Sequence, residues 1–412
     1  MELFVGVDWA EDHHDLCVMD AAGRVRAKGR VSDDLAGVVR VHDLIASAVP
    51  ADVDDDEADR VGVTVGIETD RGLLVRALVA SGYRVLAVNP LSVDRYRDRT
   101  RVSGAKSDPG DARVLADMVR TDAHQHRPVA ADSDLAEAIK LVARSHQSAI
   151  WSRRRLANQA RSALREFYPA ALEAFGDVTH ADAVAVLSIA SSPEQGKRLS
   201  RSKIAAALRR CGRQLNVERR AAEIQAALRT EHLTQAPVVA DAYGAIVASL
   251  MSVIGSHTRQ IDELEEVLET HFGQHPDATI LRSLPGLGVV TGARVLGEFG
   301  DDPTRYHDAS ARRNYAGTSP LTVASGTRRI VRARHIRNRR LADALHWWAF
   351  NAISRSPGAR ALYDKRRAAG DTHSGALRVV ANRLVGILHG CLRTPTPYDE
   401  HTAWAHRTPG AA

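Results

Sequence analysis

The first 122 residues alternate short apolar segments with helical patterns. Five segments have the β-branched, apolar composition of strands and are bounded by turn residues; they are residues 3–10, 14–21, 24–31, 61–68 and 83–89. Three segments have the spacing of amphipathic helices; they begin at Ser32, near residue 71 and at Asp108. An acidic loop, residues 51–60, separates the two halves. The pattern predicts the order βββαβαβα, with the first three strands antiparallel.

That order is the arrangement of ribonuclease-H-like α/β domains. In such a sheet the first and fourth strands lie side by side, and the last helix lies across their ends. We therefore expect residues 1–122 to form a ribonuclease-H-like domain, followed by long helices and a mainly α C-terminal domain.

Residues 123–275 contain two long helical patterns, from Asp134 to Pro169 and from Val238 to Phe272. Helices of this length usually pack on each other or on a second protomer. Arginines at 153, 154, 155, 161 and 165 fit a solvated helix face and a phosphate track equally well. Residues 176–235 are expected to form a smaller helical insertion.

Residues 276–395 are expected to form the C-terminal domain, and residues 396–412 a tail. The segment 285–288 reads PGLG and precedes a helical pattern, as in helix-hairpin-helix modules, where glycines let the backbone approach phosphate. A tight connection between two helices would have the same sequence.

The composition bounds the class of protein. A chain of 412 residues with 44% hydrophobic content is long enough for two or three domains. No apolar run was expected to reach the roughly 18 residues of a membrane span, and no signal peptide is evident. The sequence therefore predicts a cytoplasmic protein without a membrane partner.

Positive charge is concentrated in residues 325–340, SGTRRIVRARHIRNRR. This segment holds seven arginines and no acidic residue, whereas the whole chain has a formal charge of only +6. Such a cluster suits phosphate contacts, since guanidinium groups bind phosphate in a bidentate manner. The predicted nucleic-acid contacts are Arg328, Arg329, Arg332, Arg334 and Arg337. His335 lies among them and is expected to be a further phosphate contact.

Four carboxylates are candidates for a metal site. Asp108 and Asp111 lie three apart at the start of a helix, where they could cap it or share a cation. Asp8 interrupts an apolar strand, and Glu68 closes another. The predicted sheet brings all four to one edge, where their mutual repulsion favours bound cations. Two Mg²⁺ ions would suit such a site and are suited to phosphoryl transfer.

Several motifs resemble the transposases of insertion-sequence family 110, the DEDD transposases. The resemblance rests on GVDWA, GIETDRGLLVRAL, GYRVLAVNP, the KSDPGDA block and YAGTSPLTVASGTRR, in the family's order. It implies that Asp8, Glu68, Asp108 and Asp111 are the acidic tetrad, holding Mg²⁺ or, as a substitute, Mn²⁺. Asp70 departs from the glycine that many relatives carry there, and we expect it to alter only a turn.

The same resemblance implies that Ser325 is the nucleophile of a recombinase that passes through a phosphoserine intermediate. It also implies three kinds of partner: donor and target DNA, a structured guide RNA encoded by the element, and further copies of the chain. The copies would form a dimer or tetramer through the long helices, and the protein would be associated with the nucleoid. Taken alone, Ser325 is a loop serine before glycine, and Ser319 is its nearest rival.

Two other functions use the same residues. A structure-specific endonuclease of the Holliday-junction type would use the tetrad with metal-activated water as nucleophile. A non-catalytic DNA-binding protein is disfavoured, because all four carboxylates and Ser325 are present. A sugar-kinase- or actin-like ATPase begins with a similar strand, but the sequence lacks its second glycine-rich phosphate loop.

Overall fold

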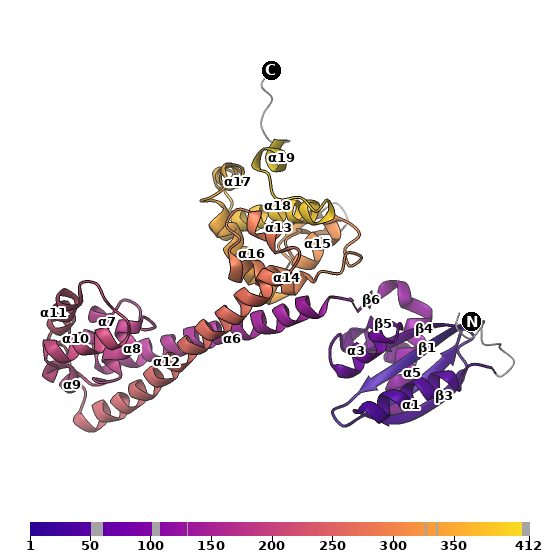
Figure 1. Ribbon diagram of the computed structural model, residues 1–412, viewed down its shortest axis with the longest axis horizontal. Helices are drawn as coiled ribbons and strands as arrows, with labels where there is room; N and C mark the ends of the chain where they lie inside the picture. Colours follow the sequence, from indigo (N-terminus) through magenta and orange to yellow (C-terminus); the bar gives the residue numbers. More distant parts are fainter. Residues whose placement is uncertain (51–60, 101–107, 130, 326–327, 335–336, 406–412) are drawn as a thin grey trace, which may run out of the picture. The chain divides into compact units, whose positions relative to one another are not determined.

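The computed structural model describes residues 1–50, 61–100, 108–129, 131–325, 328–334 and 337–405. The chain divides into two compact units, Met1–Ala131 and Asp132–Ala412, which are described separately (Figure 1). The acidic loop 51–60 and His335 lie outside the described residues. The four-part domain division expected from the sequence stays a prediction.

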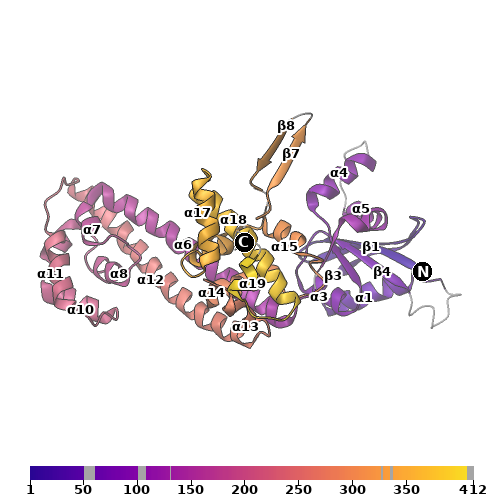
Figure 2. The same ribbon diagram turned by 90° about the horizontal axis from the view of Figure 1, so that it is seen from above.

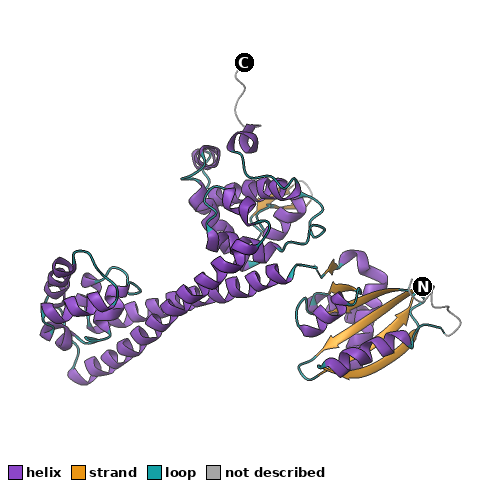
Figure 3. Cartoon of the chain, in the orientation of Figure 1, coloured by secondary structure: helices purple, strands orange, loops and turns teal. Residues whose placement is uncertain are grey.

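Unit 1 is built on a six-stranded sheet in the order β3-β2-β1-β4-β5-β6 (Figure 3). The strands are β1 Glu2–Trp9, β2 His13–Asp20, β3 Val25–Ser32, β4 Gly62–Ile67, β5 Arg84–Ala87 and β6 Arg127–Pro128. Strands β1, β2 and β3 are antiparallel, while β4 runs parallel to β1 and β5 parallel to β4. The predicted α/β architecture and the neighbouring first and fourth strands are confirmed.

Helices cover both faces of this sheet. Strand residues alternate between the faces, so Leu3, Val5 and Val7 of β1 join one core with α1 (Leu35–Ala46) and α3 (Leu73–Ala80). Phe4 packs on the opposite side, against residues of α4 (Pro90–Thr100) and α5 (Asp108–Asp122). A short 3₁₀ turn, η1 (Ala123–Gln125), follows α5. The face covered by α5 is called the α5 face below.

A glycine allows α5 to lie directly on β1. A Cβ atom added to Gly6 would lie 1.9 Å from the carbonyl oxygen of Ala112, far inside contact distance. Only glycine is compatible with this approach, because the obstructing atom belongs to the backbone of the helix. The beginning of α5 is thereby held close to the end of β1.

Several boundaries differ from the prediction for local reasons. Helix α1 is capped by Asp34, whose carboxylate accepts from the Gly37 amide at 2.7 Å, whereas Ser32 remains in β3. Asp108 is the first residue of α5 rather than its N-cap. Helix α4 was not predicted, because its sequence PLSVDRYRDRT has few apolar residues.

Unit 2 is organised around two long helices, α6 (Asp134–Phe167) and α12 (Pro237–Gln274), which pack along each other. The second half of α6 and the first half of α12 share a core with the short helices between them. These short helices are α7 Pro169–Ala174, α8 Ala181–Leu187, α9 Pro193–Arg198, α10 Arg201–Arg210 and α11 Val217–Leu228. Both predicted long helices are confirmed, and residues 176–235 contain the short helices α8 to α11 joined by loops.

The opposite ends of α6 and α12 join a second core. It contains Ile139 and Phe272 from the long helices and extends to Trp404 in the expected tail. The remaining helices are α13 Ala278–Ser283, α14 Val289–Phe299, α15 Ala309–Ala316, α16 Arg339–Ala352, α17 Pro357–Ala368, α18 His373–Arg393 and α19 Glu400–Trp404.

The PGLG turn joins α13 to α14 and packs against the end of α16. Gly286 has φ +74°, and a Cβ there would lie 2.6 Å from the Ala352 nitrogen. The Pro285 carbonyl accepts a 3.0 Å hydrogen bond from Trp348 Nε1. These contacts make Gly286 part of a tight connection between helices, whereas Gly288, at the start of α14, has open space around it.

One hairpin interrupts the helices of unit 2. It consists of β7 (Leu321–Ser325) and β8 (Arg328–Arg332), and it stands out from the helical body (Figure 2). The hairpin was not predicted, since both strands are short and β8 is rich in arginine.

Helix α12 is long and apolar enough to cross a membrane by length and composition, contrary to the sequence-based expectation, and is the one such helix in the described part of the chain. This is weak support for a span, because core helices of soluble proteins meet the same criterion. In this structure Val247, Met251 and Ile254 of α12 contribute to the core shared with α6.

Candidate metal and nucleic-acid sites

Strand alternation places polar residues on the α5 face at the ends of two neighbouring strands. Asp8 follows Phe4 and Gly6 on this face of β1, and it is half-buried. Register pairs Val7 with Ile67, the last residue of β4, so Glu68 follows the end of the parallel strand beside Asp8. Asp15 of β2 lies directly opposite Asp8 in the antiparallel register and is 6% exposed.

The first turn of α5 brings two more carboxylates to this position. Asp108 is exposed, whereas Asp111, one turn further, is 5% exposed. The backbone contact between Gly6 and Ala112 fixes this turn next to the end of β1. The structure therefore brings together Asp8, Glu68, Asp108 and Asp111, the four carboxylates that the sequence singled out.

The electrostatics of Asp8 reflect this crowding. Its pKa is raised from 3.8 to about 6, first by burial and then by the charges of Asp111, Asp108, Glu68 and Asp15. Burial and like charges both disfavour the ionised form of a carboxyl group. A cation at this place would relieve both effects.

Two arginines already balance part of the negative charge. Arg97 of α4 places Nη2 2.8 Å from Asp111 Oδ1. Arg30 of β3 places Nη2 2.7 Å from Asp15 Oδ2 and 3.5 Å from Asp108 Oδ2. Asp15, Asp108 and Asp111 are thus oriented by arginines of the same unit.

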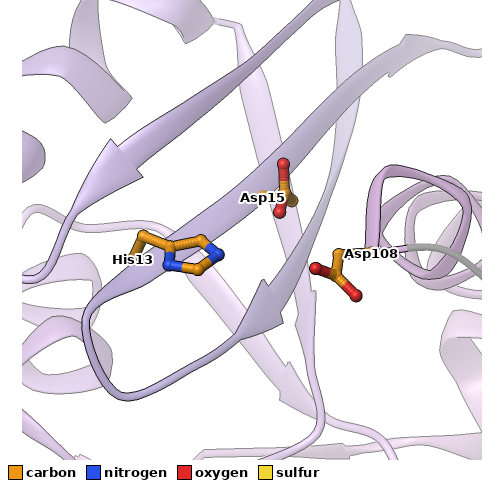
Figure 4. Close-up of side chains that lie close together, drawn as sticks. All are labelled: His13, Asp15 and Asp108. Carbon is orange, nitrogen blue, oxygen red and sulfur yellow. The ribbon is translucent and has the colours of Figure 1, made fainter.

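Within the described part of the chain, one group of side chains has the geometry of a metal site. His13, Asp15 and Asp108 each offer a ligand atom, and the three atoms lie within 4.8 Å of one another (Figure 4). Carboxylate oxygens are the preferred ligands of Mg²⁺ and Mn²⁺, and Mn²⁺ also accepts imidazole. The chemistry of these donors, together with the raised pKa of Asp8, fits a divalent cation.

Sequence reasoning missed His13, Asp15, Arg30 and Arg97 at this site. A signal for Asp15 was present, because residues 3–10 and 14–21 were expected to form a hairpin. Counting outward from residues 10 and 14 would have placed Leu16 opposite Asp8 and Asp15 one position away, because the observed turn is one residue shorter than expected and pairs Asp8 with Asp15. Arg97 carried no such signal, since α4 itself was not predicted.

Ser325 lies in unit 2, at the end of β7, and its partner in register is Arg328. The sequence-based expectation of a loop serine is therefore wrong, because Ser325 is paired in a strand. Ser319 precedes β7 and lies outside the hairpin strands.

The predicted arginine contacts are distributed along and after β8. Arg328, Arg329 and Arg332 belong to β8, and Arg332 pairs with Leu321 at the base of the hairpin. Arg334 follows the strand, and Arg337 is exposed just before α16. The cluster thus continues from the hairpin to the helical body of unit 2.

Comparison with known proteins gives two family matches. A family described as "Transposase" matches residues 5–169, and the "Transposase IS116/IS110/IS902 family" matches residues 278–364. The chain is 44% identical, over 100% of its length and 99% of the relative, to the mini-circle putative transposase for IS117 of Streptomyces coelicolor. The chain belongs to the IS116/IS110/IS902 family of transposases.

Other relatives of this transposase belong to insertion elements. It is 27% identical to the IS900 uncharacterized 42 kDa protein of Mycobacterium paratuberculosis, with 98% of each chain covered. It is 31% identical to the IS110 uncharacterized 43.6 kDa protein of Streptomyces coelicolor, with 72% of each chain covered. The first family match contains the carboxylates of the candidate metal site, Asp8, Asp15, Glu68, Asp108 and Asp111. The second match contains Ser325 and the arginine cluster.

Proposed function

We propose that this transposase cuts and rejoins DNA strands through a phosphoserine intermediate on Ser325, assisted by divalent cations on unit 1. The observation that carries the proposal is the gathering of Asp8, Glu68, Asp108 and Asp111 on the α5 face, in a chain of a transposase family. The strand order and the position of α5 support a ribonuclease-H-like fold for unit 1.

The tetrad Asp8, Glu68, Asp108 and Asp111 would hold Mg²⁺, or Mn²⁺ as a substitute. Bound there, the metal would supply positive charge to the scissile phosphate and acidify the attacking hydroxyl. Asp15 adds a fifth carboxylate beside Asp8, while Arg30 and Arg97 keep the carboxylates oriented. Proton competition at Asp8 would make cation binding stronger above about pH 6.

The covalent step exchanges one phosphoester for another. Ser325 Oγ forms a bond to phosphorus and loses its proton, while the bond from phosphorus to the leaving sugar oxygen breaks and that oxygen gains a proton. The energy of the diester is retained in the protein–DNA bond, so a hydroxyl of a second strand can reverse the exchange. Arg328 and Arg329, next to Ser325 in the hairpin, would neutralise charge on the phosphate.

The proposed partners are nucleic acids and further copies of the chain. Donor and target DNA are the substrates, and a structured element-encoded RNA would guide their choice. A homo-oligomer, dimer or tetramer, would supply the active sites for several strands, and its place of action would be the cytoplasm, at the nucleoid.

A suicide substrate tests the phosphoserine. A nicked DNA that loses its leaving strand should trap a protein–DNA adduct, visible as a shifted band on a denaturing gel. Ser325→Ala should lose the adduct and keep DNA binding, whereas Ser319→Ala should keep both. Persistence of cleavage in Ser325→Ala would show that water is the nucleophile, as in a junction-resolving endonuclease.

Mixing inactive variants tests whether one site uses both units. If the tetrad of one chain acts with Ser325 of another, a mixture of Asp111→Asn and Ser325→Ala chains should recover part of the activity that each lacks alone. Wild-type oligomers are the active control. If the mixture stays inactive while this control is active, the tetrad and Ser325 of one site belong to the same chain.

A further inference from the structure

Helix α16 exposes two large aromatic side chains side by side. Trp347 and Phe350 are 42% and 43% exposed, and their rings meet edge to face with centroids 5.9 Å apart. The aromatic row continues to His373 and from there to Tyr363. Exposed aromatic surface is costly in water, and a contiguous row of this kind is typical of a binding surface.

A positively charged cavity of about 360 Å³ lies beside this row. Its lining contains Arg337, Arg339 and Arg378 against one carboxylate, that of Asp343. Although Arg337 is exposed as a whole, partial burial of its guanidinium and then the nearby charge of Arg378 lower its pKa. An anion between the two guanidinium groups would offset this effect of like charge. Ser374, in the first turn of α18, also lines the cavity, where the helix dipole favours negative charge.

A larger cavity, of about 830 Å³, is lined mainly by α6, α12 and α14, and its α16 wall consists of Asp343, Trp347 and Asn351. Two side chains in its wall are almost fully buried, namely His146 at 1% and Arg294 at 8% exposed. Arg294 Nη2 donates to His146 Nδ1 at 3.1 Å, so His146 carries its proton on Nε2.

Both side chains keep an unused donor. His146 Nε2 and Arg294 Nε have no hydrogen-bond partner among the described residues, and an oxygen of Glu265 lies 3.8 Å from His146 Nε2. Both nitrogens are closed to solvent, and a buried donor without an acceptor is costly. A ligand can satisfy them only where this wall opens toward it, and the oxygen and nitrogen acceptors of a nucleobase or sugar suit such donors.

We propose that the α16 face, defined as Trp347, Phe350 and the two cavities beside them, binds unpaired nucleotides. Bases stack on the two aromatic rings, a backbone phosphate lies between Arg337 and Arg378, and a base or sugar enters the larger cavity. Double-stranded DNA does not fit this chemistry, because its bases already stack on one another. The inference rests on the proposed function, in which strand exchange exposes single strands.

Unpaired DNA and unpaired RNA share this chemistry, and the test separates them. Fluorescence anisotropy with labelled oligothymidine and oligouridine, in a Ser325→Ala chain without Mg²⁺, measures binding without any covalent step. Trp347→Ala should weaken single-strand binding about tenfold, as expected for the loss of one base stack, whereas Trp347→Phe should retain most of it. The tighter of the two probes identifies the source of the nucleotides.

Matched variants locate the effect. Arg378→Ala should make the log–log salt dependence of single-strand binding shallower by about 0.7, the value for one phosphate contact. Leu233→Ala removes a side chain that is 96% exposed elsewhere in unit 2 and should change nothing. Duplex affinity should be the same in the wild type and in Trp347→Ala.

Unchanged oligonucleotide affinity in both Trp347→Ala and Phe350→Ala would overturn the proposal. Unchanged affinity with a smaller particle mass would assign the α16 face to a protein partner instead. If Trp347→Ala lowers the melting temperature, Trp347→Phe provides a second test. The oligonucleotide should quench tryptophan fluorescence less in Trp347→Phe than in the wild type. Equal quenching in both proteins would refute stacking on Trp347. Failure of the wild type to form a protein–DNA adduct, with intact binding at the α16 face, would refute only the phosphoserine.

Discussion

Arg97 and Asp111 form a short ion pair where α5 begins, with Nη2 2.8 Å from Oδ1. The Arg97 side chain is 15% exposed and that of Asp111 is 7% exposed, so neither charge is well solvated. Asp111 therefore has two tasks, since it orients Arg97 and faces the other carboxylates. Any variant at Asp111 must separate the loss of a metal ligand from the loss of this pair.

Asp111→Asn makes that separation. Its amide oxygen can still accept from Arg97, while the negative charge near the phosphate disappears. We expect strand cleavage to be abolished and DNA affinity to be unchanged or raised. Asp94→Asn is the matched control, because Asp94 also pairs with Arg97, at 3.1 Å, but is exposed. Wild-type cleavage by Asp111→Asn would return Asp108 and Asp111 to a helix-capping role.

The raised pKa of Asp8 predicts a pH-dependent stability. A carboxyl group with a pKa of about 6 in the folded protein and 3.8 when unfolded favours folding at low pH and loses this contribution as pH rises through 6. Without metal, Asp8→Asn should therefore be more stable than the wild type at pH 7.5 by about 1 kcal/mol, allowing for solvent screening, and equally stable near pH 3.

Metal binding should reverse this difference. Mg²⁺ should raise the melting temperature of the wild type at pH 7.5 and have little effect on Asp8→Asn, because the cation binds the ionised carboxylates. Calorimetric melts with Mg²⁺ or with a chelator measure both quantities. Equal stabilisation of both proteins by Mg²⁺ would place the cation elsewhere.

The arginines of β8 predict a salt effect on nucleic-acid binding. Replacing Arg328, Arg329 and Arg332 with alanine should weaken binding and make its log–log salt slope shallower by up to about 3. A control with the same charge change is the triple alanine variant of Arg210, Arg219 and Arg229, which are exposed on or next to α10 and α11. An unchanged slope in the β8 variant would mean that the cluster does not touch phosphate.

Helix α12 predicts self-association through an exposed apolar stripe. Val239, Ile246, Val253 and Val267 are 38–51% exposed and fall on a seven-residue spacing. That spacing is typical of helices that pack on a partner helix. Light scattering should show more than one chain per particle, and Ile246→Lys with Val253→Lys should lower the mass. A monomeric wild type, with and without nucleic acid, would leave α6 and α12 as an intramolecular pair only.

The sheet of unit 1 could be predicted because its strands carry their own signal. Leu3, Val5 and Val7 alternate with residues of the other face, and this pattern survives in the sequence without any tertiary information. The tetrad could be located for the same reason, since Asp8 and Glu68 end strands whose adjacency follows from the fold. Their metal ligation and the role of Ser325 stay predictions.

Interactions between distant segments could not be predicted. The pairing of Arg97 with Asp111 depends on α4, whose polar sequence gives no helical stripe. The partner of Ser325 depends on a hairpin that alternates arginine with a few β-branched residues. His146 and Arg294, whose side chains share a hydrogen bond, lie 148 residues apart in the sequence.

The pair α6 and α12 also sets a fixed spacing within unit 2. Its two cores lie at opposite ends of these helices, and the 34 residues of α6 span about 51 Å. Each residue deleted from both helices would shorten the pair by about 1.5 Å and rotate the distal core by about 100°. The length of the two helices therefore also determines the orientation of the distal core about the helix axis. Only changes in length close to whole helical turns would keep the distal core facing the same direction.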